Sequence, residues 1–324
     1  MSLRNKRIVN KLVETGVTLL LATLVLFIII NLAPGDPIRI LLGTPEVASV
    51  NNQVYQEKYQ ELREAYHLDD SILVQYVAWM KNVLRFNLGD SFYTNQPVII
   101  ELGKRMPATL LLTIPAIIIQ LTLGIGLGII SALKHNKTID NLIRLFCVFL
   151  SSLPGFAISL MLLYLFAVRL KLYEISHTVS LMRLYLPTIT LGIISSPALI
   201  RVVRSNMLEE LGKQYTAFAI ARGVKKRAVI RGALKNIMLP IMTLAAHSSV
   251  NLIGGSVIIE SIFSWPGIGK YALDSILLRD YPVVQGYGFL MICIVIAINL
   301  LVELGYIFID PRLKRPERKI RWGG

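Results

Sequence analysis

The sequence has few of the residues from which catalytic and metal sites are built. Its four histidines are dispersed, and no HxxxH, CxxC or paired-carboxylate spacing occurs. Zinc and related metals need clustered ligands, so we expect no metal site and no cofactor within this chain. Both cysteines lie in apolar segments, which is typical of small core residues rather than of a disulfide. The histidines are His67, His135, His177 and His247, and the cysteines are Cys147 and Cys293.

A nucleotide-binding loop is also missing. The nearest approach to a Walker A sequence is Gly267-Ile-Gly-Lys270, which is followed by Tyr271. It lacks the upstream glycine and the serine or threonine that would reach Mg²⁺. No serine–histidine–aspartate arrangement stands out either. We therefore expect this chain neither to hydrolyse ATP itself nor to be an enzyme.

Charged residues are scarce, at 17% of the chain, and acidic residues (20) are scarcer than lysines and arginines (34). Hydrophobic residues make up 54%, and the mean hydropathy is +0.59, which excludes an ordinary soluble protein. Six segments come close to the ~20 apolar residues that a helix needs to cross a bilayer. We predict an all-α polytopic membrane protein with six transmembrane helices, at 12–32, 109–132, 145–168, 186–204, 239–262 and 285–309.

Two of these spans have unusual flanks or contents. The first follows the basic residues 1–11 and is longer than the apolar region of a signal peptide, so we expect it to be retained as a helix. The fourth is the least apolar, because it carries Ser195, Ser196 and Pro197. A proline is tolerated in a spanning helix where neighbouring helices or water satisfy the carbonyl that it frees.

The placement of the lysines and arginines predicts the orientation. One side of the membrane would hold 22 of the 34, and acidic residues run opposite, 5 on that side against 12 on the other. Basic loops stay in the cytoplasm, so both termini are predicted to be cytoplasmic. The net charge of +14 then reflects topology and attraction to lipid headgroups, and nucleic acid is not an expected partner. The basic segments are 1–11, 133–144, 205–238 with the adjoining Arg201 and Arg204, and 310–324.

Three acidic residues fall within the spans. Glu14, Glu260 and Glu303 are each near a span end, where we expect water to reach them. They are too far apart in the sequence to suggest a pair of carboxylates, so an intramembrane hydrolase is not favoured.

The external segment 33–108 is too long and too charged to be only a connector. Tyr55, Tyr59, Leu62 and Tyr66 follow a helical spacing, which predicts one amphipathic helix. Asp70 or Ser71 can cap a second helix. Two interpretations stay open, a pair of helices lying on the outer membrane surface and a docking platform for an external partner. The apolar face of the second helix would hold Leu73, Tyr76, Val77, Met80 and Leu84.

Two features inside the spans suggest helix contacts or a path for solutes. Gly124 and Gly128 form a G-xxx-G pair, which lets helix backbones approach closely in lipid. His247, Ser248 and Asn251 form a polar stripe on the fifth span. Polar groups at that depth face a bundle interior or water, so this stripe makes either interhelical hydrogen bonds or part of a pore lining.

The longest basic stretch, residues 214–240, lies between two predicted spans. It combines alanines at 217, 219 and 221 with Gly223, then the basic run Lys225–Arg227, and ends at Leu239-Pro240. The alanines allow close approach, Phe218 and Ile220 can act as anchors, and Gly223 permits a sharp turn between two short helices. We therefore predict a docking site for another protein. The basic run either steers an acidic partner or only obeys the positive-inside rule.

This stretch resembles the cytoplasmic "EAA" loop of the permease subunits of binding-protein-dependent ABC importers. Ala219, Gly223 and Leu239-Pro240 match the small residue, the glycine and the Leu-Pro of that pattern, while Ala217 stands where the family commonly has a glutamate. The resemblance implies an ATPase-coupling loop within 205–238. Its candidate residues are Tyr215, Ala217, Phe218, Ala219, Ala221, Arg222, Gly223, Leu239 and Pro240.

Further motifs resemble the oligopeptide, dipeptide and nickel branch of this family. They span nearly the whole chain in order, and the long external segment resembles the first of the two permease types in such systems. The motifs are Leu73-Val-Gln-Tyr-Val-Ala-Trp79, Asn87-Leu-Gly-Asp-Ser-Phe92, Gln96-Pro-Val98, Ile262-Phe-Ser-Trp-Pro-Gly-Ile-Gly269, Arg279-Asp-Tyr-Pro-Val-Val-Gln-Gly286 and Asp310-Pro-Arg-Leu313.

The resemblance implies a type I ABC importer permease in a prokaryotic plasma membrane. Residues 109–309 would form the five-helix permease core, 1–11 and 310–324 its cytoplasmic ends. The implied partners are a second permease with a shorter loop, two ATP-binding subunits and an extracytoplasmic binding protein that delivers peptides or nickel and metal-chelate complexes. A stand-alone secondary transporter or channel is the alternative, but the sequence shows no clear repeat. A receptor or scaffold would explain the basic loop but not the other motifs.

Overall fold

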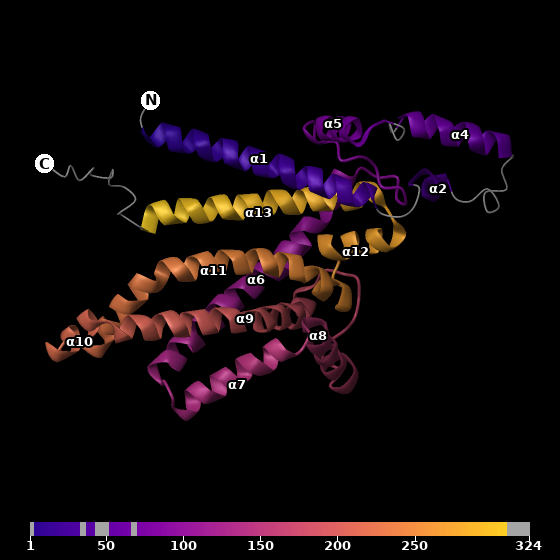
Figure 1. The fold of residues 1–324 in the computed structure, drawn as a ribbon. Helices are drawn as coiled ribbons and strands as arrows, with labels where there is room; N and C mark the ends of the chain where they lie inside the picture. Colours follow the sequence, from indigo (N-terminus) through magenta and orange to yellow (C-terminus); the bar gives the residue numbers. More distant parts are fainter. Residues whose placement is uncertain (1–2, 33–36, 43–51, 66–69, 310–324) are drawn as a thin grey trace, which may run out of the picture. The chain divides into compact units, whose positions relative to one another are not determined.

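The computed structural model describes residues 3–32, 37–42, 52–65 and 70–309, and helices dominate this part of the chain (Figure 1). The predictions for Tyr66, His67 and the tail 310–324 lie outside the described residues. The helices are α1 (Leu3–Asn31), α2 (Pro37–Leu42), α4 (Asn52–Ala65), α5 (Ile72–Val83), α6 (Val98–Leu133), α7 (Thr138–Ser152), α8 (Gly155–Leu163) with a π-helical turn (Tyr164–Arg169), α9 (Leu181–Gly212), α10 (Gln214–Ala221), α11 (Lys226–Ile262), α12 (Ile268–Leu278) and α13 (Tyr281–Ile309).

Within the described residues, five helices are long and apolar enough to cross a membrane, and a bent pair is a sixth candidate. This confirms the predicted all-α polytopic membrane class. The five apolar stretches are Val13–Asn31, Val98–Leu133, Leu181–Gly212, Lys226–Ile262 and Tyr281–Val302, and the pair is Thr138–Ser152 with Gly155–Arg169.

The bent pair departs from a single straight span. The predicted segment 145–168 lies across a bend of 97° between α7 and α8. Leu153 has an extended backbone (φ −100°, ψ 138°), as the ring of the following Pro154 demands. Pro154 also has no N–H to donate to the preceding turn, so α7 ends before it and α8 begins after it.

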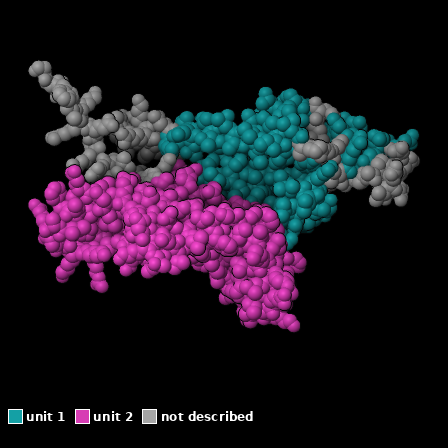
Figure 2. Space-filling view, turned by 60° about the horizontal axis from the view of Figure 1, so that its bottom comes forward, with its two compact units in different colours: residues 1–109, 266–296 teal, residues 110–265, 297–324 magenta. Residues whose placement is uncertain are grey.

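Chain contacts divide the protein into two compact units, residues 1–109 with 266–296 and residues 110–265 with 297–324 (Figure 2). In the second unit, α9 packs most extensively against α11 and also against α7. Its main core joins α6, α9 and α11, and the buried members are Ala132, Leu199, Val203, Met207, Ala233, Ile237 and Ile241.

The predicted glycine pair lies where α6 meets α9. A Cβ on Gly128 would come within 2.7 Å of Val203 Cβ, and one on Gly124 would overlap Leu199. Gly192 on α9 approaches α6 in return, because its Cβ would lie 2.9 Å from the Ala116 carbonyl oxygen. The packing role predicted for Gly124 and Gly128 is therefore confirmed.

The fourth predicted span is one continuous helix in spite of Pro197. A proline cannot donate to the carbonyl four residues earlier, which here belongs to Ile193. The Ser196 hydroxyl donates to that oxygen at 2.8 Å and replaces the missing bond. Ser196, one of the serines that lower the hydropathy of this span, thus helps the helix to accommodate the proline.

In the first unit, α5 packs on α1. The Thr23 and Tyr76 hydroxyls are 2.9 Å apart, and the Phe27 ring contacts both Tyr76 and Trp79. Ser71 precedes α5 as predicted, but its side chain makes no capping hydrogen bond. Only part of the predicted apolar face of α5 is covered, since Leu73, Val77 and Leu84 are exposed.

One expectation about the span ends is wrong. Glu260, expected to reach water, is fully buried near the end of α11. The Ser256 hydroxyl donates to its carboxylate at 3.4 Å, and the Glu260 carbonyl accepts from the Trp265 N–H at 2.7 Å. The turn that follows holds Phe263 and Trp265, whose side chains are also fully buried, so the glutamate belongs to a buried helix end.

Candidate functional site

The candidate docking site is the turn of chain that connects α9 to α11. Helix α10 lies at the far end of these two long helices (Figure 1). Gly223 has φ +77°, a left-handed conformation that glycine adopts without strain, and it ends the turn after α10. The sequence predicted a short helix on each side of this turn. The helix that follows the turn is long instead, because α11 runs unbroken from Lys226 through Leu239 and Pro240 to Ile262.

A buried glutamate holds this turn together. Glu210, near the end of α9, is only 4% exposed. Its carboxylate accepts hydrogen bonds from Asn236 Nδ2 of α11 (2.6 Å) and from Lys213 Nζ (2.5 Å). Asn236 also donates to the Tyr215 hydroxyl at 2.9 Å, and the Thr216 hydroxyl donates to the Glu210 carbonyl at 3.0 Å. One residue therefore links the end of α9, the start of α10 and the first part of α11.

The charge of Glu210 acts on Lys213. The hydrogen bond that Lys213 donates to this carboxylate raises the pKa of the ammonium group above its usual value. A raised pKa keeps the lysine protonated at and above neutral pH. Lys213 therefore stays charged in the physiological range, and α10 begins directly after it.

The outer surface of the turn is apolar and exposed. Phe218 is 68% exposed, Ile220 59% and Tyr215 51%. Ala219, between Phe218 and Ile220 in the sequence, is half-buried. A large aromatic side chain in this position covers no core of its own chain, which is typical of a surface that another protein covers. The other exposed predicted site residues are Ala217, Ala221, Arg222, Gly223 and Pro240, and Leu239 is half-buried.

The structure divides the predicted polar stripe on α11. His247 and Asn251, one helical turn apart, are exposed on one face of the helix. Ser248 instead accepts a hydrogen bond from Gln120 of α6, and Gln120 also donates to the Ser195 carbonyl at 2.9 Å. Ser248 thus takes part in the polar contacts among α6, α9 and α11, whereas His247 and Asn251 do not.

Three buried polar groups of the second unit were not predicted from the sequence. They are Glu210, Gln120 and the ion pair of Asp140 with Arg204, whose closest N–O distance is 2.7 Å. The partners that join them to another long helix (Asn236, Ser248, and Arg204 with Asp140) lie between 26 and 128 residues away in the sequence, so no local spacing reveals these contacts. The available signal was a polar residue within a predicted span, as for Gln120.

Fold and site together define a multi-span helical membrane protein that presents a short exposed helix between two long ones. Residues 124–315 match the family described as the inner membrane component of binding-protein-dependent transport systems, and residues 5–113 match the N-terminal part of such components. The chain belongs to this family and is a permease subunit of an ABC importer.

Two relatives show the same relationship over nearly their full length. The nickel import system permease protein NikB of Staphylococcus aureus (strain MRSA252) is 36% identical over 308 residues, 95% of this chain and 91% of the relative. The dipeptide transport system permease protein DppB of Alkalihalophilus pseudofirmus is 35% identical over 321 residues, 90% of this chain and 94% of the relative. The resemblance to the peptide and nickel branch is therefore confirmed, and the secondary-transporter alternative is not favoured.

Proposed function

We propose that this permease is the first type of the two in an importer of peptides or of nickel and metal-chelate complexes. A shorter-loop permease, two ATP-binding subunits and an extracytoplasmic binding protein would complete the complex. The relatives named for dipeptide and nickel transport support both kinds of cargo. Nickel would travel as a small chelate, so the path needs no cluster of metal ligands. Identifying the ligand of the binding protein that co-purifies with the complex tests the choice between them.

The exposed apolar surface of α10 carries the proposal of ATPase coupling. Phe218 and Ile220 are anchors of the kind that dominate protein interfaces, and Gly223 and Glu210 fix the shape of the turn that bears them. ATP-driven closure of the partner subunits would move this turn and with it α9 and α11. The transport cycle then follows from the different affinities of the partners for the inward- and outward-facing states.

A charge placed on the docking surface tests this coupling. Phe218→Asp is expected to abolish co-purification of the ATP-binding subunits while the permease still inserts, because the aspartate would lose its hydration in the interface. Leu172→Asp is the matched control, since Leu172 is 64% exposed in the loop between α8 and α9 and lies outside the proposed site. Normal ATPase association of the Phe218→Asp variant would reject the docking role of α10.

The predicted cytoplasmic position of α10 can be measured directly. We propose that α10 and both termini face the cytoplasm, on the strength of the basic residues around them. Single cysteines replacing Ala221 and Leu172, in a chain whose own two cysteines are changed to serine, would be labelled with a membrane-impermeant maleimide. Labelling at 172 but not at 221 in intact cells is expected, and the reverse pattern would overturn the orientation.

We further propose that His247 and Asn251 line the translocation path, because both side chains are exposed on one face of a spanning helix. Ser248 has a packing role instead, since it accepts from Gln120. His247→Ala and Asn251→Ala should lower uptake while leaving assembly and basal ATP hydrolysis intact. Unchanged uptake in both variants would remove them from the path. Ser248→Ala should lower the thermal stability of the complex without a selective effect on uptake.

A further inference from the structure

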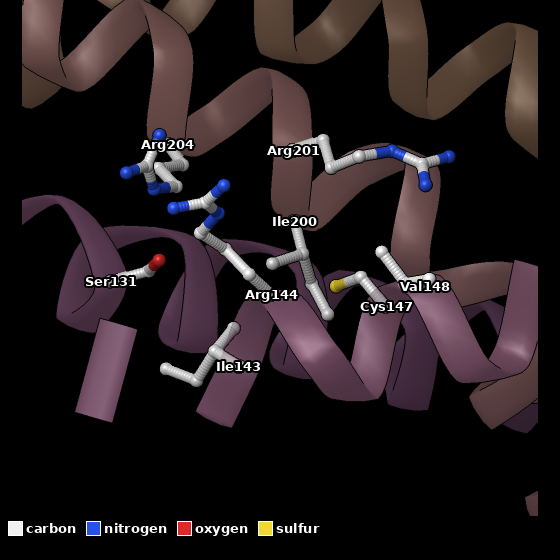
Figure 3. A pocket seen from close by; sticks show the side chains of 8 residues that line it. All are labelled: Ser131, Ile143, Arg144, Cys147, Val148, Ile200, Arg201 and Arg204. Atoms are coloured by element: carbon white, nitrogen blue, oxygen red, sulfur yellow. The ribbon is translucent and has the colours of Figure 1, made fainter. Parts of the chain in front are cut away.

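A cavity of about 280 Å³ lies among α6, α7 and α9, and none of its lining residues belongs to α10 or α11 (Figure 3). Three arginines line it: Arg144 of α7 and Arg201 and Arg204 of α9. Figure 3 shows Arg144 extending toward the Arg204 end of the cavity and Arg201 extending the other way. Arg144 and Arg204 stand at the ends of the predicted spans 145–168 and 186–204, where lipid headgroups are expected.

The cavity carries excess positive charge. Asp140 neutralises Arg204 through two hydrogen bonds, from Nε (2.8 Å) and an Nη (2.7 Å), and also accepts from Ser131 and from the Asn136 N–H. The oxygens of this carboxylate are thus occupied. In the part of the chain that the structure describes, no carboxylate lies within 4.0 Å of Arg144 or Arg201. Among the described residues, Arg201 donates to the neutral Ser151 hydroxyl, at 3.1 Å, and to no acidic group.

Apart from Ser131, the remaining walls are apolar and continue onto the open face of α7. Ile143, Cys147 and Ile200 are buried within the cavity, and Val148 at its edge is 57% exposed. Leu145 and Phe149, on the same helix, are 65% and 59% exposed. A cationic cavity that opens beside an apolar helix face matches a molecule with an anionic head and hydrocarbon chains.

We propose that this cavity binds the headgroup of an anionic phospholipid. The phosphate would accept charge-assisted hydrogen bonds from the Arg144 guanidinium, which pairs with no carboxylate among the described residues, with Arg201 and Arg204 as further donors. The acyl chains would lie along the exposed face of α7. A free phosphate ion would use the same guanidinium groups but not the apolar face, so the structure favours the lipid. This site is independent of the proposed coupling role of α10.

Thermal unfolding of the purified transporter complex in detergent tests the site. Added phosphatidylglycerol is expected to raise the unfolding temperature of the wild type, whereas phosphatidylcholine and inorganic phosphate at the same concentration are not. In the double variant Arg144→Gln/Arg201→Gln, the half-saturating concentration of phosphatidylglycerol should rise at least about tenfold, the loss expected for one charge-assisted hydrogen bond. Arg227→Gln/Arg231→Gln, which removes two exposed arginines elsewhere in the same unit, should respond like the wild type.

A second variant keeps the test decisive if the double variant is unstable. Val148→Trp narrows the cavity without changing its charge and should also remove the effect of phosphatidylglycerol. Equal protection of the wild type and of both cavity variants would overturn the proposal. Protection by inorganic phosphate equal to that by phosphatidylglycerol would overturn the assignment to lipid and leave an anion site. Protection by phosphatidylcholine as well would show a non-specific detergent–lipid effect and reject the headgroup site.

Discussion

Replacing Glu210 by alanine should loosen the turn that carries α10. The substitution removes the carboxylate acceptor that holds Asn236 of α11, and leaves Asn236 the Tyr215 hydroxyl as its acceptor among the described residues. A hydrogen bond to a charged group contributes about 1.5–3 kcal/mol, and we expect the lower end because Asn236 is exposed. A loss of about 1.4 kcal/mol is a factor of ten in an equilibrium, so the open population of the turn should rise about tenfold.

Hydrogen exchange of the permease pair without its ATP-binding subunits measures this opening directly. Amides of residues 213–222 should exchange about tenfold faster in Glu210→Ala, while the cores of α9 and α11 keep their protection. Glu209→Ala is the matched control, because Glu209 is the adjacent glutamate, is exposed and makes no hydrogen bond within the described structure. Glu210→Gln should retain most of the protection, since the amide oxygen can still accept from Asn236.

Two outcomes would refute this account of Glu210. If Glu210→Ala exchanged at the wild-type rate, the buried carboxylate would not be what orders the turn. If exchange stayed unchanged while affinity for the ATP-binding subunits fell, Glu210 would act by touching the partner. The exchange measurement is made without the partner, so it separates order within the turn from contact across the interface.

Two further pairs of glycine variants test the backbone and the packing. Gly223→Ala should destabilise the turn by about 1 kcal/mol, because the φ angle of Gly223 is +77°. Gly232→Ala should be neutral or stabilising, because Gly232 lies in a helix with open space around it. Hydrogen exchange of residues 213–232 compares the two variants. Gly128→Leu should lower the stability of the complex by about 1–3 kcal/mol, because the larger side chain forces α6 away from α9. Gly126→Leu should not lower it, because nothing lies within 4 Å of a Cβ placed on Gly126. Thermal unfolding in detergent distinguishes the two variants, and equal effects would contradict the packing of Gly128 against α9.

The membrane class and the helix pairing could be read from the sequence because they depend on local properties. Length and hydropathy identify a span, and paired small residues such as Gly124 and Gly128 mark a close helix contact. The bend after Ser152 was not predicted, although the sequence shows Pro154 within the predicted span. Hydropathy is summed over a window and carries no direction, so an apolar helix, a break and a second apolar helix resemble one span.

The turn was predicted in part for a similar reason. Gly223 has a local signature, because a left-handed residue between helices favours glycine. Glu210 has none, because its partner Asn236 is 26 residues away and comes near it only when α9 and α11 pack together. Glu209 and Glu210 stand side by side in the sequence, and nothing local shows that the second is buried while the first is exposed.

Ala217 and Glu210 lie at different places in the turn, and the two residues therefore have different roles. The family pattern commonly has a glutamate at the position of Ala217, and this residue is exposed beside Phe218 on the outer surface of α10. An acid there would face the partner and could not reach the buried side of the turn, which Glu210 occupies from α9. Alanine at 217 therefore leaves the internal order of the turn intact and makes the proposed docking surface more apolar. We expect association with the ATP-binding subunits to depend on Phe218 packing more than on salt concentration.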